Sequence, residues 1–212
     1  MIEIEKKFQL NQEQFARLLE DAEKLSEKRF TDTYYDSVSW RLTTRDTWLR
    51  SRDGAFELKV PLDKRGVDDT VDKYHEITDE LQIRKVLKLA RAGTLEQALA
   101  QAALKPFATI TTLRKKYRHG EFAIDVDEAD FGYNVVEIEL EAPTLSDIDR
   151  VTAEILDFAR SKGLEVKKLN GKVCEYIERN NPDHYEALVK AGVFGDFVWH
   201  RKPTAAKSAR AV

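Results

Sequence analysis

The chain contains very little cysteine and no long apolar segment, and both absences narrow its class. Cys174 is the single cysteine among 212 residues, so no disulfide can form within the chain, and a reducing compartment suits it. No stretch approaches the ~18 apolar residues of a membrane-spanning helix. The opening segment MIEIEKKFQL lacks the apolar core of a signal peptide. We therefore expect a cytoplasmic protein without a membrane partner.

Strong charge of one sign is also lacking. The 35 basic and 38 acidic residues leave a net charge of only −3, which does not steer the molecule as a whole toward nucleic acid. A Walker loop, a glycine-rich phosphate cradle, a GxSxG nucleophile elbow and a His/Cys cluster with zinc spacing are all absent from the sequence. Any anion site must therefore come from local sorting of charge.

Strand-like and helical patterns alternate along the chain, which predicts the α+β class with a large antiparallel sheet or barrel. Periodicity alone does not decide whether the sheet closes. Asp53-Gly54 and His119-Gly120 predict tight hairpin turns. The expected strands cover 2–10, 29–36, 47–53, 55–60, 73–78, 107–118, 121–128 and 132–141.

Capping residues and apolar stripes predict the helices between these strands. The first is expected after Asn11, with Gln14 in the reciprocal capping position and an apolar stripe that reaches Leu25. The others are expected to begin at Thr78, Thr94, Ser146, Asn170 and Asn181-Pro182. Residues 1–199 are predicted to form one domain, followed by a disordered tail over 200–212 that lacks apolar periodicity.

Charged residues recur at the two-residue spacing that places them on one face of a strand. They are also sorted by sign, since one strand carries only basic residues and another only acidic ones. A solvated outer face would explain any single strand, but like charges side by side repel, so an ordinary surface mixes the signs. The sorted sets are Arg114, Lys116 and Arg118 on one strand and Glu137, Glu139 and Glu141 on another.

Amphipathic helices are available to cover the apolar faces, which would turn the charged faces toward one another inside the sheet. A dry interior of that kind would be prohibitively costly. A wet interior that holds a polyanion and a divalent cation resolves the cost, because the basic strands would meet phosphate oxygens and the carboxylates would meet the metal. Oxygen ligands suit Mg²⁺ or Mn²⁺.

The pattern resembles the CYTH superfamily of triphosphate tunnel metalloenzymes, whose ExExK signature matches Glu3-Ile4-Glu5-Lys6-Lys7. The resemblance extends over residues 2 to about 190 and is strongest to the thiamine-triphosphatase branch. It is carried by DTYYD (32–36), WLRSR (48–52), FELK (56–59), DVDEADFGY (125–133), EIE (137–139) and Lys172 before NNPDHY. The family's fold is an eight-stranded antiparallel β-barrel that forms a triphosphate tunnel with peripheral helices, and this is the expectation here.

The resemblance also assigns roles to individual residues. It implies an acidic set that binds Mg²⁺, with Mn²⁺ as the alternative, made of Glu3, Glu5, Asp125, Glu137 and Glu139. It implies a set of cations that bind the triphosphate, made of Lys7, Arg50, Arg52, Lys59, Arg114 and Lys172. Glu76 matches a further acidic tunnel position. Four residues share strand parity with these sets but receive no role, namely Lys116, Arg118, Asp127 and Glu141.

Two hypotheses concern catalysis and specificity. The cations around Lys59 are expected to lower its pKa, so that a neutral Lys59 acts as a base with Tyr34 as its partner. A tunnel carboxylate is the alternative base, and Lys59 would then be a phosphate ligand only. Trp48 shares the face of Arg50, so its indole is expected at the organic end of the substrate. Packing at the barrel rim is the alternative role for Trp48.

The predicted function is Mg²⁺-dependent hydrolysis of thiamine triphosphate to thiamine diphosphate and phosphate by a monomer. Hydrolysis of inorganic tripolyphosphate is the first alternative. Cyclisation of ATP and non-catalytic polyphosphate binding are the weaker ones, because an anion-binding module needs no carboxylate cluster. The expected partner in every case is a small-molecule triphosphate, not a nucleic acid.

Overall fold

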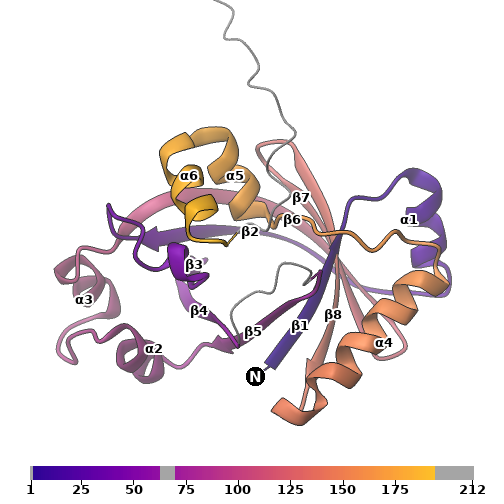
Figure 1. Cartoon of the computed structure of the whole chain (residues 1–212), viewed down its shortest axis with the longest axis horizontal. Coiled ribbons are helices and arrows are strands. Elements are labelled where there is room, and N and C mark those ends of the chain that lie inside the picture. The colour runs from indigo at the N-terminus through magenta and orange to yellow at the C-terminus, as the bar shows by residue number, and fades with distance from the viewer. Residues whose placement is uncertain (1, 63–69, 194–212) are drawn as a thin grey trace, which may run out of the picture.

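Eight antiparallel strands close into a barrel in the order β1-β5-β4-β3-β2-β6-β7-β8 (Figure 1). The computed structural model describes residues 2–62 and 70–193. The strands are β1 (Ile2–Phe8), β2 (Glu23–Asp36), β3 (Trp48–Arg52), β4 (Ala55–Pro61), β5 (Asp72–Ile77), β6 (Lys105–His119), β7 (Phe122–Ala129) and β8 (Tyr133–Ala142). The predicted fold class and the closed barrel are confirmed.

The strands turn their charged faces inward, as the alternation of the sequence requires. Ile4 and Phe8 of β1 join Ile138 of β8 in an outer apolar core, which the helices α1 (Gln12–Leu19) and α4 (Ile148–Ser161) cover. A second outer core lies under α2 (Glu80–Leu87) and α3 (Leu95–Gln101) and includes Leu49 and Leu58. Because the apolar faces are buried outside the barrel, the charged faces line the lumen.

A third apolar cluster lies at one end of the lumen itself. Ile110, Ala129 and Val135 have the same strand parity as the charged lumen residues, and they pack against Val173 and Ile177. The last two residues belong to α5 (Lys172–Asn180), which packs with α6 (Pro182–Lys190) and lies against β6 and β8 (Figure 1). This helical pair therefore covers one end of the barrel with apolar side chains.

The structure confirms several of the turns and helix caps that the sequence predicts. Asp53 and Gly54 both have positive φ angles, 48° and 92°, which is the geometry of the two-residue hairpin turn between β3 and β4. The Asn11–Gln14 capping box is formed at the start of α1, and Pro182 begins α6. These residues act on their immediate neighbours, so their effect is readable without tertiary context.

Several helix limits were predicted wrongly. Helix α1 ends at Leu19 because the chain turns into the long strand β2 at Glu23, and Leu25 lies on that strand with 46% of its surface exposed. Asp79 instead of Thr78 caps α2, which ends at Leu87. A 3₁₀ turn, Leu145–Asp147, precedes α4, so this helix does not begin at Ser146. Gly171 is the N-cap of α5 in place of Asn170.

The C-terminal boundary at 199 and the predicted tail over 200–212 lie outside the described residues. Within the described parts of the chain, no helix combines the length and the apolar character needed to cross a membrane.

Candidate active site in the barrel lumen

A cavity of about 760 Å³ occupies the lumen, and it brings together residues from all eight strands and from α5. Nearly every predicted site residue lines it. Those at the cavity surface are Glu3, Glu5, Lys7, Tyr34, Trp48, Arg50, Arg52, Lys59, Glu76, Arg114, Glu137, Glu139 and Lys172. Asp125 is fully buried and reaches the lumen through its ion pair with Arg114.

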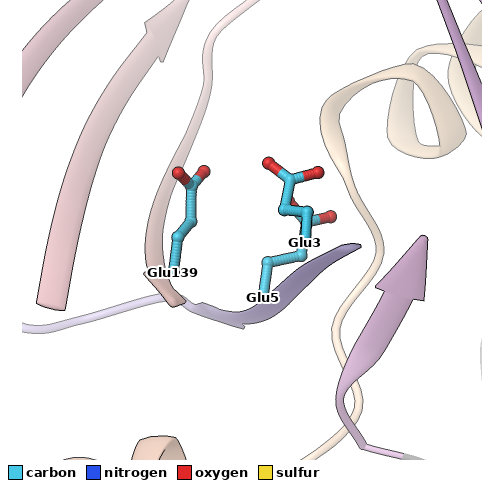
Figure 2. A group of neighbouring side chains, drawn as sticks. All are labelled: Glu3, Glu5 and Glu139. Atoms are coloured by element: carbon cyan, nitrogen blue, oxygen red, sulfur yellow. The ribbon is translucent and has the colours of Figure 1, made fainter. Parts of the chain in front are cut away.

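Carboxylates from three strands converge into two overlapping groups, each able to offer three oxygen atoms within 4.8 Å of one another. One group is Glu3, Glu5 and Glu139, and the other is Asp125, Glu137 and Glu139. Figure 2 shows the carboxyl group of Glu139 facing those of Glu3 and Glu5 across a short gap. Cross-strand pairing explains the convergence, because Glu5 lies opposite Glu139 and Asp125 lies opposite Glu137.

The carboxylates of this cluster lie close enough to disfavour one another's ionised form. Burial and the nearby carboxylates of Asp125 and Glu3 raise the pKa of Glu139 to about 8. Burial and Glu5 likewise raise the pKa of Glu137. Close carboxylates resist simultaneous ionisation unless a positive charge joins them. Hard oxygen donors in this number fit Mg²⁺ or Mn²⁺.

The predicted cations are present in the same lumen, and several are paired with these carboxylates. Lys7 contacts Glu5 and lies 2.6 Å from a carboxylate oxygen of Asp72. Arg114 contacts Asp125 and donates a hydrogen bond of 2.9 Å to Glu137. The two predicted sets are therefore brought together, and they neutralise each other in part.

The expected lowering of the Lys59 pKa is wrong for the lumen as the structure describes it. Burial does disfavour the ammonium form, but Glu5 and Glu3 outweigh burial and raise the pKa of Lys59 above its ordinary value. The Lys59 amino group contacts Glu3 and lies 3.5 Å from Glu5. Tyr34 also resists ionisation, because burial and the charge of Asp32 raise its pKa.

Lys172 reaches the lumen from α5, which follows a strap of residues 162–171 that crosses the barrel wall from α4. The Tyr133 hydroxyl donates a hydrogen bond of 2.6 Å to the carbonyl oxygen of Asn170 and so fixes the end of the strap. A Cβ atom at Gly171 would lie 3.1 Å from Cε of Lys7. The absence of a side chain at Gly171 thus lets the start of α5 approach Lys7 closely.

Comparison with known proteins agrees with this geometry. The CYTH domain matches residues 1–170. The chain belongs to the CYTH family. Its similarity to the human thiamine-triphosphatase is 29% identity over 208 residues, which covers 90% of each chain. The enzyme of the same name from Macaca fascicularis matches with the same identity and coverage. These matches support triphosphate hydrolysis as the type of activity.

Solved structures share the fold of this CYTH domain. The PH1819 protein of Pyrococcus horikoshii superimposes with a TM-score of 0.60 at 20% identity, over 84% of this chain and 99% of its own. A Hippeastrum protein described as an adenylyl cyclase candidate with a dominant triphosphatase activity gives a TM-score of 0.50 at 16% identity, over 84% and 94% of the two chains. At these identities the likeness concerns the fold alone.

Among the carboxylates of the CYTH lumen that were not predicted as site residues, Asp32 and Asp127 are fully buried. Asp32 accepts two hydrogen bonds from Arg52, of 2.8 and 3.0 Å. Asp127 accepts two from Arg114, of 2.6 and 2.7 Å, and contacts the amino group of Lys172. Both residues hold predicted phosphate ligands in place.

The remaining residues of the same parity lie toward solvent. Lys116 lies 3.4 Å from Asp125 at the edge of the CYTH lumen, and Glu141 lines the cavity with an exposed side chain. Arg118 pairs with Glu23 on the surface. Strand parity does not distinguish these positions from Asp32 and Asp127. A neighbouring arginine on the paired strand, Arg52 for Asp32 and Arg114 for Asp127, is the signal that could have done so.

Trp48 is packed and also borders the lumen cavity. Only 7% of its surface is exposed and it packs in the apolar cluster under α5, yet it lines the cavity. Its indole N–H donates a hydrogen bond of 2.8 Å to Asp46, which also accepts one of 2.9 Å from the Tyr74 hydroxyl. Asp46 therefore fixes two aromatic side chains of the cavity wall.

Proposed function

We propose that this CYTH protein hydrolyses thiamine triphosphate to thiamine diphosphate and phosphate with Mg²⁺ as its metal. The observation that carries the proposal is the shared lumen, in which two overlapping clusters of carboxylates lie with the six predicted lysine and arginine side chains. The similarity to enzymes named thiamine-triphosphatase supports the choice of substrate. Phosphoryl transfer needs mainly positioning and charge neutralisation, which such a lumen supplies.

The acidic residues would hold the metal. Glu139 is shared by both carboxylate groups and is therefore the central ligand, with Glu3 and Glu5 on one side and Asp125 and Glu137 on the other. When bound, the ion neutralises charge on the phosphate oxygens. The raised pKa of Glu139 is consistent with this role, because a nearby cation would favour the ionised carboxylate.

The basic residues would bind and orient the triphosphate chain. Arg50, Arg52 and Arg114 present planar guanidinium groups suited to two-point contacts with phosphate oxygens. Lys7, Lys59 and Lys172 add point charges. These lysines already form ion pairs with carboxylates. The triphosphate would therefore replace those carboxylates as the partner of each lysine.

Two hypotheses account for the activation of water. A neutral Lys59 with Tyr34 as its partner requires the influence of Glu3 and Glu5 on Lys59 to be removed, as it would be if both bound the metal. A tunnel carboxylate is the alternative base, and Glu76 is the candidate whose pKa suits this role. Burial and Glu3 raise the pKa of Glu76 to about 7, which matches a base that acts near neutral pH.

The variants Lys59→Arg and Glu76→Gln separate these hypotheses. Under the lysine hypothesis, Lys59→Arg keeps the charge and loses the rate, whereas Glu76→Gln leaves the pH dependence of kcat in place. Under the carboxylate hypothesis, Glu76→Gln removes the rise of kcat through about pH 7 and Lys59→Arg retains that rise. Profiles of kcat against pH for the three proteins decide between them.

A substrate panel tests the proposed function itself. Thiamine triphosphate, inorganic tripolyphosphate and ATP are supplied with Mg²⁺ or Mn²⁺, and phosphate and cyclic AMP are measured. The proposal expects the highest kcat/KM for thiamine triphosphate with Mg²⁺. A preference for tripolyphosphate would contradict the assigned substrate but keep the triphosphatase activity, and cyclic AMP as the main product would contradict hydrolysis.

Trp48→Ala sharpens the choice between the first two substrates. The thiazolium ring of thiamine is cationic, and an indole face attracts such a cation by ~0.5–2 kcal/mol. The variant should therefore raise KM for thiamine triphosphate several-fold and leave the kinetics with tripolyphosphate nearly unchanged. Equal losses on both substrates would make Trp48 a packing residue only.

A further inference from the structure

Phe30 is an aromatic side chain in a place where the lumen is otherwise charged. It lies on β2 with the inward parity of Asp32 and Tyr34, and only 5% of its surface is exposed. Among the described residues it belongs to none of the three apolar clusters. Its burial therefore involves other partners, and two of these are arginines.

Arg52 and Arg114 both stack on the Phe30 ring. The guanidinium carbon of Arg52 lies 4.0 Å from the ring centroid, and that of Arg114 lies 5.5 Å from it. Arg52 comes from β3 and Arg114 from β6, the two strands that flank β2. The ring thus receives one arginine from each neighbouring strand.

Each arginine is also held at its nitrogen atoms by a buried carboxylate. Asp32 accepts both contacts from Arg52 at 2.8 and 3.0 Å, and Asp127 accepts both from Arg114 at 2.6 and 2.7 Å. A guanidinium clamped between a carboxylate and a ring has little freedom left. The two positive groups repel each other, and the ring that both contact offsets this repulsion.

We propose that Phe30 is a positioning residue that sets the separation of Arg52 and Arg114, so that the two arginines grip the two outer phosphoryl groups of one triphosphate chain. This inference rests on the proposed function, because it assumes that both arginines bind the chain. It goes further by assigning selectivity for chain length to a residue without a hydrogen-bonding group. A shorter phosphate chain would gain less from the fixed separation, since it does not span both arginines.

The test compares Phe30→Leu, which removes the ring and keeps an apolar side chain, with Phe30→Tyr, which keeps the ring. Calorimetric titration of the metal-free proteins with inorganic tripolyphosphate and, separately, with pyrophosphate gives two dissociation constants for each variant. Loss of two cation–ring contacts should weaken tripolyphosphate binding about tenfold in Phe30→Leu. Pyrophosphate binding should weaken by about threefold or less, and Phe30→Tyr should stay close to the wild type for both.

A matched control is Phe122→Leu. Phe122 stacks on Phe158 outside the lumen at 4.2 Å between ring centroids, so this variant should lower the melting temperature without changing either dissociation constant. Phe30→Met provides a second ring-free variant if Phe30→Leu does not fold. Unchanged tripolyphosphate binding in the ring-free variant would overturn the proposal. So would equal losses for tripolyphosphate and pyrophosphate, or a loss in Phe30→Tyr as large as that in Phe30→Leu.

Turnover keeps this inference separate from the proposed function. A wild-type protein that binds tripolyphosphate but hydrolyses no triphosphate would contradict the proposed function, and the binding comparison would still decide the role of Phe30. The role of Phe30 alone would be contradicted if the wild type hydrolysed thiamine triphosphate and Phe30→Leu still preferred tripolyphosphate over pyrophosphate as strongly as the wild type does.

Discussion

The lumen contains two kinds of carboxylate, which differ in their neighbours: some lie next to other carboxylates, and some are paired with arginines. Glu139 faces other carboxylates, and burial together with Asp125 raises its pKa to about 8. Asp32 is at least as deeply buried, yet Arg52 and Arg50 outweigh its burial and lower its pKa. The same type of side chain therefore lies among like charges in one place and is paired with arginines in the other. Under the proposed function, the metal binds where the fold leaves carboxylates next to one another.

The largest expected effect is on catalysis at the acidic cluster. Glu139→Gln should reduce turnover about a thousandfold, because it removes the ligand common to both carboxylate groups. The melting temperature of the metal-free protein should not fall, since the change removes repulsion between buried carboxylates. Glu141→Gln, two residues along the same strand and exposed, is the control and should keep near wild-type activity. Wild-type turnover of Glu139→Gln at limiting Mg²⁺ would contradict the metal assignment.

For the carboxylates that are paired with arginines, we expect a larger effect on stability than on catalysis. Asp127→Asn should destabilise the protein by ~3 kcal/mol, because it leaves the charges of Arg114 and Lys172 without their buried partner. Denaturant unfolding measures this loss, and KM for the substrate should rise at temperatures where the variant is folded. If Asp127→Asn were as stable as the wild type, the contrast between the two kinds of carboxylate would fail.

The pH dependence of stability gives a third comparison. A carboxyl group whose pKa rises from 4.5 to about 8 on folding stabilises the folded state fully below pH 4.5 and loses that contribution as the pH rises through 8. The metal-free wild type should therefore lose ~1 kcal/mol or more between pH 5 and pH 8 relative to Glu139→Gln. Urea unfolding of both proteins across this range tests the difference. A parallel course of the two curves would show that Glu139 is not protonated near neutral pH.

The smallest expected effect concerns the strap that carries Lys172. Gly171→Ala places a Cβ atom 3.1 Å from Cε of Lys7, so the Lys7 side chain must shift by a few tenths of an ångström. Because Lys7 is paired with Glu5, KM should rise about threefold with little change in stability. Steady-state kinetics measure it, and Gly132→Ala, with no atom within 4 Å of the added Cβ, separates crowding from the strain of a positive φ. An unchanged KM in Gly171→Ala would mean that the close approach of α5 to Lys7 has no functional role.

Much of the fold was readable because strand parity is a local property. Alternating residues such as Glu3, Glu5 and Lys7 fix which face turns inward, and closure of the barrel then brings the predicted residues into one cavity. Helix limits were less readable where the next strand competes for the same residues, as at Leu25.

The remaining errors at the site have a non-local origin. The pKa of Lys59 depends on Glu3 and Glu5, which closure of the barrel brings from the far end of the sequence. In the sequence alone, Asp127 looks like a solvent-exposed charge, and only the structure shows that it is a partner of Arg114. Phe30 likewise reads as an ordinary core residue, because only the structure shows two guanidinium groups at its ring.

The ion pairs of the lumen have a thermodynamic consequence. Glu3 contacts Lys59, and Asp125 and Glu137 contact Arg114, so proposed metal ligands and proposed phosphate ligands occupy one another. An ion that draws the carboxylates away releases the cations for phosphate, and a phosphate chain that takes the cations releases the carboxylates. Metal and triphosphate are therefore expected to bind with positive heterotropic coupling, each increasing the affinity for the other by the same factor. The protein would respond to the concentration of the metal–triphosphate complex more steeply than to either component alone.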